Sequence, residues 1–88
     1  MVVIDSSILK DLYYANLIYE IHKTAEKLRI YRKKYGLSFD EFEETVKSDE
    51  TEDFNKWDDY MEWKAYEKLM VRYQKEKKDL EIGNYKVS

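Results

Sequence analysis

Apolar residues recur along most of this chain at spacings of three and four positions, which is the period of an α-helix. The pattern is interrupted at Gly36 and again at the polar run 48–53. It therefore predicts a long helix, a short helix and a second long helix, at about 7–35, 39–47 and 53–82. Only Val2–Ile4 and Tyr85–Val87 could instead form a short pair of strands.

The corner after the first predicted helix carries strong local signals. Gly36 can adopt the left-handed conformation that ends a helix, and Lys33 and Lys34 lie in the preceding turn, where cations complement the helix dipole. Ser38 stands three residues before Glu41, which is the spacing of a reciprocal capping box. One helix thus ends and another begins within a few residues. We expect an all-α fold in which the two long helices are antiparallel.

The third predicted helix has two apolar stripes, whereas a monomeric hairpin needs only one. The first contains Phe54, Trp57, Met61, Ala65, Leu69 and Leu80, and the second contains Tyr60, Trp63, Tyr66, Met70 and Tyr73. We interpret the surplus as a subunit interface, so we expect a homodimer that forms a four-helix-like bundle. The residues assigned to self-association are Met61, Trp63, Tyr66, Met70 and Tyr73. The alternative is ordinary core packing within one chain.

Length and composition favour one helical domain over residues 1–88. The chain has no proline and two glycines, and 40% of its residues are charged. It has no cysteine, which excludes disulfides and thiolate metal sites and suits the cytoplasm. Its purely apolar runs, such as residues 1–4, have at most four residues, which is too short for a membrane span or a secretory signal. Richness in lysine, glutamate, tyrosine and isoleucine without proline is typical of a thermophile.

No catalytic or metal-binding constellation stands out in the sequence. His22 is the only histidine, and Ile18 occupies the position one turn before it, so only Glu26 could join it as a ligand. A single histidine in mid-helix leaves no defensible catalytic triad, and two isolated glycines leave no phosphate loop. The carboxylates form neither a Glu-x-x-His motif nor an EF-hand loop, and a solvated acidic face is the simplest interpretation. We expect no enzymatic activity, cofactor or metal.

The net charge of −3 conceals two oppositely charged segments. Residues 20–36 carry a net charge of +4, and residues 39–59 carry −8. Helix dipoles and intramolecular pairing explain such a pattern, and the alternative is an acidic face for a basic partner. The basic segment contains Tyr31 and Tyr35, which could stack on bases. The acidic residues after Gly36 would repel a phosphate backbone, so we do not expect nucleic-acid binding.

Two motifs resemble those of a group of small archaeal and cyanobacterial proteins. The first runs from Tyr31 through Leu37 into Ser38–Glu43, and the second is Asp58–Trp63, after an acidic spacer. Proteins of this group begin with a long helix, which is followed by a corner of the form KYG-(M/L)-S-x-E-E-F. An acidic stretch comes next, and then a charged helix that begins with D-(D/x)-aromatic-x-E-W. Here Asp40 stands where the pattern has glutamate. Members are commonly encoded beside small toxin genes and interpreted as antitoxins.

Two functions of different classes are therefore expected. The resemblance implies a non-catalytic, antitoxin-like protein that binds a small basic toxin of ribonuclease type. Acidic charge would speed the encounter, and aromatic side chains would hold the complex. The residues assigned to partner binding are Phe54, Trp57, Tyr60, Glu43 and Glu44. The alternative is a self-associating structural or adaptor protein that has no toxin.

Overall fold

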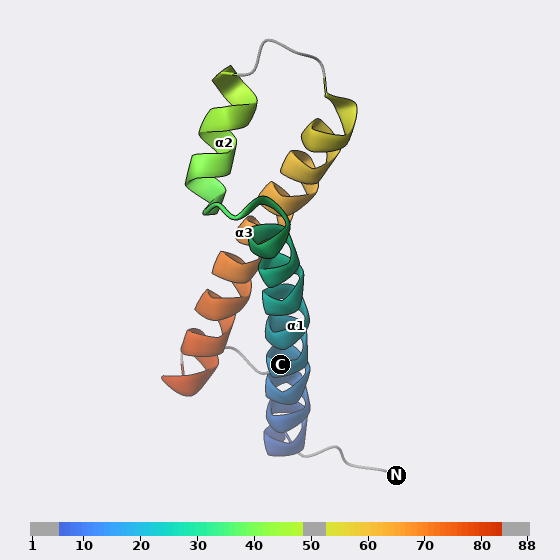
Figure 1. The fold of residues 1–88 in the computed structure, drawn as a ribbon. Coiled ribbons are helices and arrows are strands. Elements are labelled where there is room, and N and C mark those ends of the chain that lie inside the picture. The colour runs from blue at the N-terminus through green and yellow to red at the C-terminus, as the bar shows by residue number, and fades with distance from the viewer. Residues whose placement is uncertain (1–5, 49–52, 84–88) are drawn as a thin grey trace.

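The computed structural model describes residues 6–48 and 53–83, and these residues form three α-helices (Figure 1). The helices are α1 (Ser6–Tyr35), α2 (Phe39–Ser48) and α3 (Phe54–Glu81). The predicted all-α fold is confirmed, and each helix begins and ends within one residue of its predicted bound. The segments Val2–Ile4 and Tyr85–Val87, for which strands were considered, lie outside the described residues.

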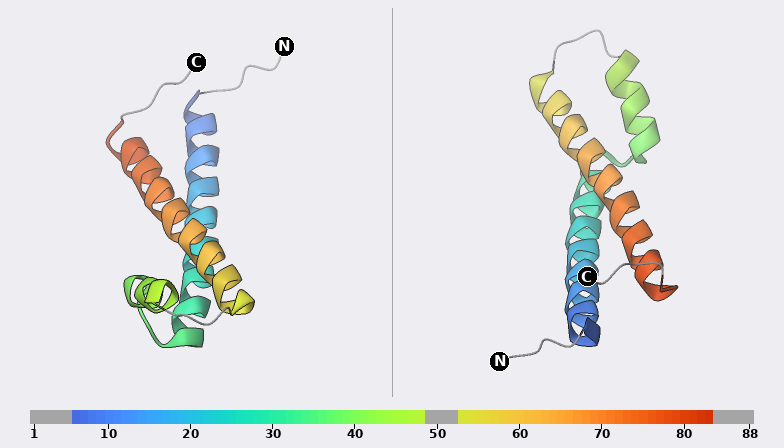
Figure 2. Two further views of the ribbon diagram at one scale, coloured as in Figure 1. Left: turned by 90° about the horizontal axis from the view of Figure 1, so that it is seen from above. Right: turned by 180° about the vertical axis from the view of Figure 1, so that it is seen from behind.

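Helix α3 runs back along the other two helices, so the chain folds as an antiparallel hairpin (Figures 1 and 2). The helices α1 and α2 follow one another, and α3 contacts both. The molecule is elongated, with extents of 62 × 22 × 19 Å. Because α1 and α3 cross, the N-terminal end of α1 and the C-terminal end of α3 diverge (Figure 2). No helix in the described residues is long and apolar enough to cross a bilayer.

The corner between α1 and α2 has the geometry that its residues predict. Gly36 lies in the left-handed region, with a φ of 65°, and its N–H donates to the Arg32 carbonyl over 2.7 Å. The Glu41 N–H donates to the Ser38 hydroxyl, and the Ser38 N–H donates to the Glu41 carboxylate, both over 3.2 Å. The predicted capping box is therefore confirmed. These local bonds turn the chain and aim α2 toward α3.

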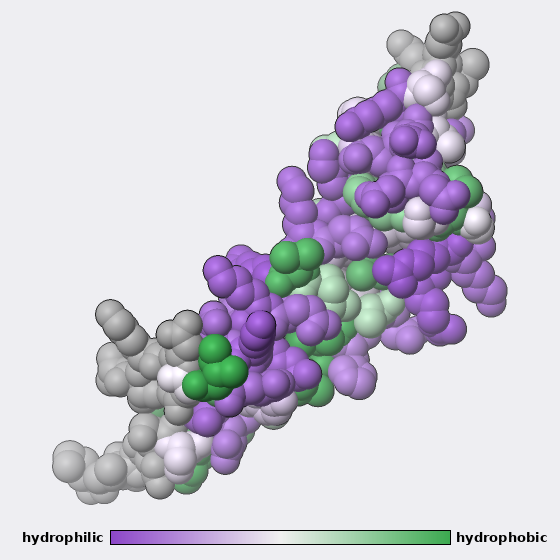
Figure 3. Space-filling model, turned by 90° about the vertical axis from the view of Figure 1, so that its left-hand side faces the viewer, coloured by the Kyte–Doolittle hydropathy of each residue, from purple (hydrophilic) through white to green (hydrophobic). Residues whose placement is uncertain are grey.

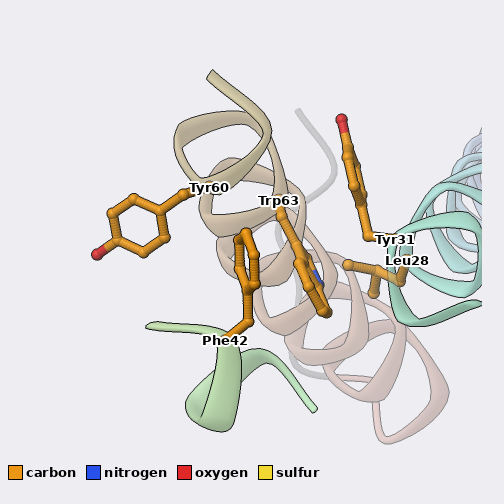
Figure 4. Packing of buried hydrophobic residues seen from close by; sticks show 5 residues of the cluster. All are labelled: Leu28, Tyr31, Phe42, Tyr60 and Trp63. Atoms are coloured by element: carbon orange, nitrogen blue, oxygen red, sulfur yellow. The ribbon is translucent and has the colours of Figure 1, made fainter. Parts of the chain in front are cut away.

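The buried core lies where the C-terminal part of α1 meets α2 and α3 (Figure 4). Trp63 of α3 is fully buried at its centre. The Trp63 ring centroid lies 5.0 Å from that of Phe42 on α2 and 5.6 Å from that of Tyr31 on α1. Leu28 and Tyr60 complete this group, which we call the core cluster. Because each helix contributes an aromatic ring, the core cluster fixes the three helices relative to one another.

Helix α1 packs on α3 along a seam whose positions alternate by four and three residues. The seam is buried or half-buried at every position, and its members are Lys10, Tyr14, Leu17, Ile21, Thr24, Leu28, Tyr31 and Tyr35. This is the heptad spacing that keeps one stripe facing a neighbouring helix. Near the diverging ends, hydroxyl groups bridge the two helices. The Tyr14 hydroxyl donates to the Glu81 carboxylate over 3.1 Å.

The structure shows where the residues of the two apolar stripes on α3 lie. Most of the residues assigned to self-association pack inside the chain, because Trp63 centres the core cluster and Tyr66 and Met70 pack against it. Tyr73 is also half-buried, and only Met61 is exposed. The reason is that α3 has two neighbours, α1 and α2, and must present a wide apolar face to cover both. The homodimer itself stays a prediction.

Candidate partner-binding surface

The N-terminal half of α3 carries an exposed apolar stripe. Phe54, Trp57 and Met61 follow helical spacing and expose 73%, 50% and 50% of their surface. We call these three residues the outer stripe. The Trp57 ring lies 5.4 Å from the ring of Tyr60, so one edge of the indole is supported by the core cluster. The core cluster is complete without the outer stripe, so packing among the described residues does not account for the stripe.

Acidic residues accompany the outer stripe. Residues 53–62 contain four acidic residues and one lysine, a net charge of −3. Asp58 and Glu62 are exposed on α3, and Glu44 is exposed on α2. The face in Figure 3 shows the general character of the surface, which is mostly hydrophilic with separate hydrophobic patches. An apolar centre with a charged rim is the usual anatomy of a protein interface, and here the rim is negative.

Two of the five residues assigned to partner binding join α2 to α3 instead. Tyr60 is only 3% exposed, and its hydroxyl donates to the Glu43 carboxylate over 2.7 Å. This hydrogen bond, with a further contribution from Lys47, holds the pKa of Glu43 below its usual value. Tyr60 and Glu43 therefore belong to the fold. The other three residues assigned to partner binding, Phe54, Trp57 and Glu44, are exposed.

Asp59 joins α3 to α1 in the same turns of α3 that carry the outer stripe. Its carboxylate accepts from the Lys34 ammonium over 2.6 Å and from the Tyr35 hydroxyl. The lysine first and the tyrosine second hold the pKa of Asp59 below its usual value. Burial, together with this carboxylate, raises the pKa of Tyr35. Asp59 thus has structural partners on α1 and is not counted with the exposed acidic rim.

Much of the basic and aromatic segment of α1 is also used inside the molecule. Tyr31 belongs to the core cluster. The Arg32 guanidinium lies 3.6 Å from the Glu67 carboxylate of α3. Arg29 pairs with Glu26 of its own helix over 2.8 Å. Intramolecular pairing therefore accounts for part of the charge asymmetry, and both tyrosines have packing partners inside the chain.

A metal centre and a pocket are the other kinds of site to consider in the described residues. His22 is exposed on α1. Within residues 6–48 and 53–83, no group of three or more histidines or acidic residues could hold a metal ion. An open hollow of about 210 Å³ lies where α1 and α3 diverge, and its lining contains no serine, threonine or histidine. It is lined by Lys10, Asp11, Tyr14, Leu80 and Glu81.

The outer stripe and its acidic rim are therefore the candidate functional surface of the described residues. Its three large side chains are exposed on α3, which packs on the core cluster through its other face. The chain matches no protein-family model, no curated protein and no solved structure.

Proposed function

We propose that this chain is a non-catalytic, antitoxin-like protein that binds a small basic protein in the cytoplasm. The partner is a ribonuclease-like toxin encoded by a neighbouring gene. The observation that carries the proposal is the outer stripe, because three large apolar side chains lie at least half exposed within an acidic rim. The likeness of Tyr31–Leu37 and Asp58–Trp63 to motifs of antitoxin-like proteins supports the same function.

The outer stripe has the chemistry of a binding hot spot. Tryptophan is enriched at hot spots, where its truncation costs about 2 kcal/mol or more of binding free energy. Phe54 and Met61 lie one helical turn before and after Trp57, so they extend the apolar contact along α3. The contact of Trp57 with Tyr60 restrains the indole before any partner arrives. A restrained side chain loses less entropy on binding.

The acidic rim contributes mainly to the association rate and to the choice of partner. Asp58 and Glu62 are exposed, so single ion pairs with a partner would be screened by water and individually weak. Their combined field nevertheless attracts a basic surface and accelerates the encounter. Added salt should therefore slow association, whereas truncating the outer stripe should speed dissociation.

Co-purification with the product of the adjacent gene tests this function. The two proteins should purify together, and Trp57→Ala should weaken the complex by about thirtyfold, the factor that corresponds to about 2 kcal/mol. Val71 is 71% exposed on α3 outside the outer stripe, so Val71→Ala is a matched control and should bind normally. The oligomeric state of both variants is measured as well, so that a change in self-association is not mistaken for a loss of binding.

A neighbouring gene product that is harmless to cells and fails to co-purify would contradict the antitoxin-like function. A self-associating structural or adaptor protein would then be the better account. One observation favours self-association on its own: the N-terminal half of α1 also exposes large apolar side chains, including Leu12 and Tyr19. The homodimer is therefore also proposed, on a surface other than α3.

A further inference from the structure

Helix α1 carries an exposed apolar row in its N-terminal half. Its members, which we call the α1 row, are Ile8, Leu9, Leu12, Ala15 and Tyr19. Ile8, Leu12 and Tyr19 expose 54%, 63% and 62% of their surface. In Figure 1 this part of α1 lies at the opposite end of the molecule from the start of α3, where the outer stripe is found.

The α1 row has the spacing of a second helix-packing seam. Ile8, Leu12, Ala15 and Tyr19 alternate by four, three and four residues, as the positions that face α3 do. The two seams are displaced by two residues, which corresponds to a rotation of about 200° around the helix. The α1 row therefore lies on the side of α1 away from α3, and the described hairpin leaves it uncovered.

Charge distinguishes the α1 row from the outer stripe. Residues 7–23 contain two lysines and two acidic residues, so their net charge is zero. In a two-fold symmetric dimer the same surface meets itself. Two neutral α1 rows can meet without repulsion, whereas two outer stripes would bring together two segments that each carry −3. The α1 row thus suits a second copy, and the outer stripe suits a different, basic protein.

The α1 row is also complementary in shape to a reversed copy of itself. Antiparallel packing of α1 against α1 of a second copy puts Leu12 opposite Ala15 and Ile8 opposite Tyr19. Large side chains then face small ones at the centre, where the two helices can approach closely. Parallel packing would instead set Leu12 against Leu12 and Ala15 against Ala15, which leaves layers alternately crowded and empty.

We propose that a second copy of this chain packs on the α1 row, through an antiparallel contact between the two α1 helices. A typical stable complex buries about 800 Å² on each partner. The α1 row extends over about three helical turns and would supply the apolar centre of such a contact, with neighbouring α1 residues as its rim. This contact does not depend on the antitoxin-like function. It leaves the two outer stripes at opposite ends of the dimer, as separate binding surfaces.

Sedimentation equilibrium on the full chain tests the contact. The wild-type chain should dimerise reversibly, and Leu12→Lys should raise the dimer dissociation constant at least about tenfold, because an unpaired ammonium would be buried. Leu12 is 63% exposed in the single chain, so the variant should keep its helical circular dichroism and its cooperative melt. Val71→Lys places the same charge at a 71% exposed site on α3 and should dimerise like the wild type.

Single-cysteine variants test the antiparallel orientation, because the chain has no cysteine of its own. An equal mixture of Ile8→Cys and Tyr19→Cys, treated with a short thiol-specific cross-linker, should give a covalent heterodimer. Each variant treated alone should give little product, because antiparallel packing places the two copies of the same position far apart.

Three results would overturn the proposal. A wild-type chain that stays monomeric throughout the micromolar range shows that no second copy covers the α1 row. A dimer that Leu12→Lys does not weaken places the contact on another surface. Efficient cross-linking of Ile8→Cys to itself, with none in the mixture, shows that the helices pack in parallel.

Discussion

At the scale of single residues, Trp63 has the largest structural role in this small core. Its ring packs against Phe42 of α2 and Tyr31 of α1, and its indole N–H donates to Glu67 of its own helix over 3.2 Å. The side chain therefore has both its apolar faces and its polar atom satisfied while fully buried. Trp63 is also the largest of the fully buried side chains.

We predict that Trp63→Ala lowers the free energy of unfolding by about 3–5 kcal/mol, the usual cost of truncating a buried aromatic residue. Urea unfolding followed by circular dichroism measures this value. Trp63→Phe keeps most of the volume and should cost less, so it remains measurable if the alanine variant does not fold. Trp57→Ala is the matched control and should cost little stability, because its ring is half exposed. Equal losses at both tryptophans would contradict the position of the core.

A second prediction at this scale concerns Gly36. Its φ of 65° lies in the left-handed region, where a Cβ is strained although no other atom lies within 4 Å of the position it would take. Gly36→Val should therefore destabilise the chain by about 1–2 kcal/mol through backbone strain alone. Gly36→Asn should cost less, because asparagine tolerates this conformation. Thermal unfolding of both variants provides the comparison, and a larger cost for asparagine would contradict it.

At the scale of elements, hydrogen bonds from tyrosine hydroxyls to carboxylates connect α3 to both neighbours. The pairs are Tyr14 with Glu81, Tyr35 with Asp59 and Tyr60 with Glu43. In each case the bond helps to hold the pKa of the carboxyl below its usual value. The folded state therefore prefers these three groups ionised more strongly than the unfolded chain does.

This preference predicts a loss of stability in acid. A carboxyl whose pKa is lower in the folded state stabilises the fold fully above its unfolded pKa of about 4. That stabilisation disappears as the pH falls through the lower, folded value. The free energy of unfolding should thus decline below about pH 4, and Asp59→Asn should make the decline shallower. Urea unfolding as a function of pH measures the slope, and an unchanged slope in Asp59→Asn would contradict the role of Asp59.

The helix bounds could be predicted from the sequence because their causes are local. Gly36 and the Ser38–Glu41 box act within a few residues, and the structure has the hydrogen bonds that they predict. The faces of α3 could not be assigned in the same way. Tyr60 and Trp57 both follow helical spacing. Which of the two rings is buried depends on where the folded chain places α2, and helical spacing does not show that.

At the scale of the whole molecule, the packing is uneven along the long axis. The core cluster joins all three helices near the C-terminal end of α1. The diverging ends of α1 and α3 have mainly Leu17, Leu80 and hydroxyl–carboxylate bonds between them. Local stability follows the number of buried apolar contacts. The diverging end should therefore open more easily than the core cluster, unless a second copy covers it.

Hydrogen exchange measured by mass spectrometry should reveal this difference. At a concentration where the Leu12→Lys variant is monomeric, its amides in residues 7–16 should exchange faster than its amides in residues 24–35, which adjoin the core cluster. In the wild-type dimer, the amides in residues 7–16 should be slowed, while those in 24–35 change little. Uniform exchange along α1 in both proteins would contradict the uneven packing.

The two tryptophans of the chain also form a natural pair of optical reporters. Trp63 lies in a dry aromatic environment within reach of Tyr31 and Tyr35, so it can collect their excitation and emit at short wavelength. Trp57 faces water along much of its ring, so its emission is shifted to longer wavelength and is accessible to iodide. Replacing Trp57 with phenylalanine would leave a fluorophore that reports only on the core. The difference between the two spectra would then report only on the outer stripe, and on whatever molecule displaces water from it.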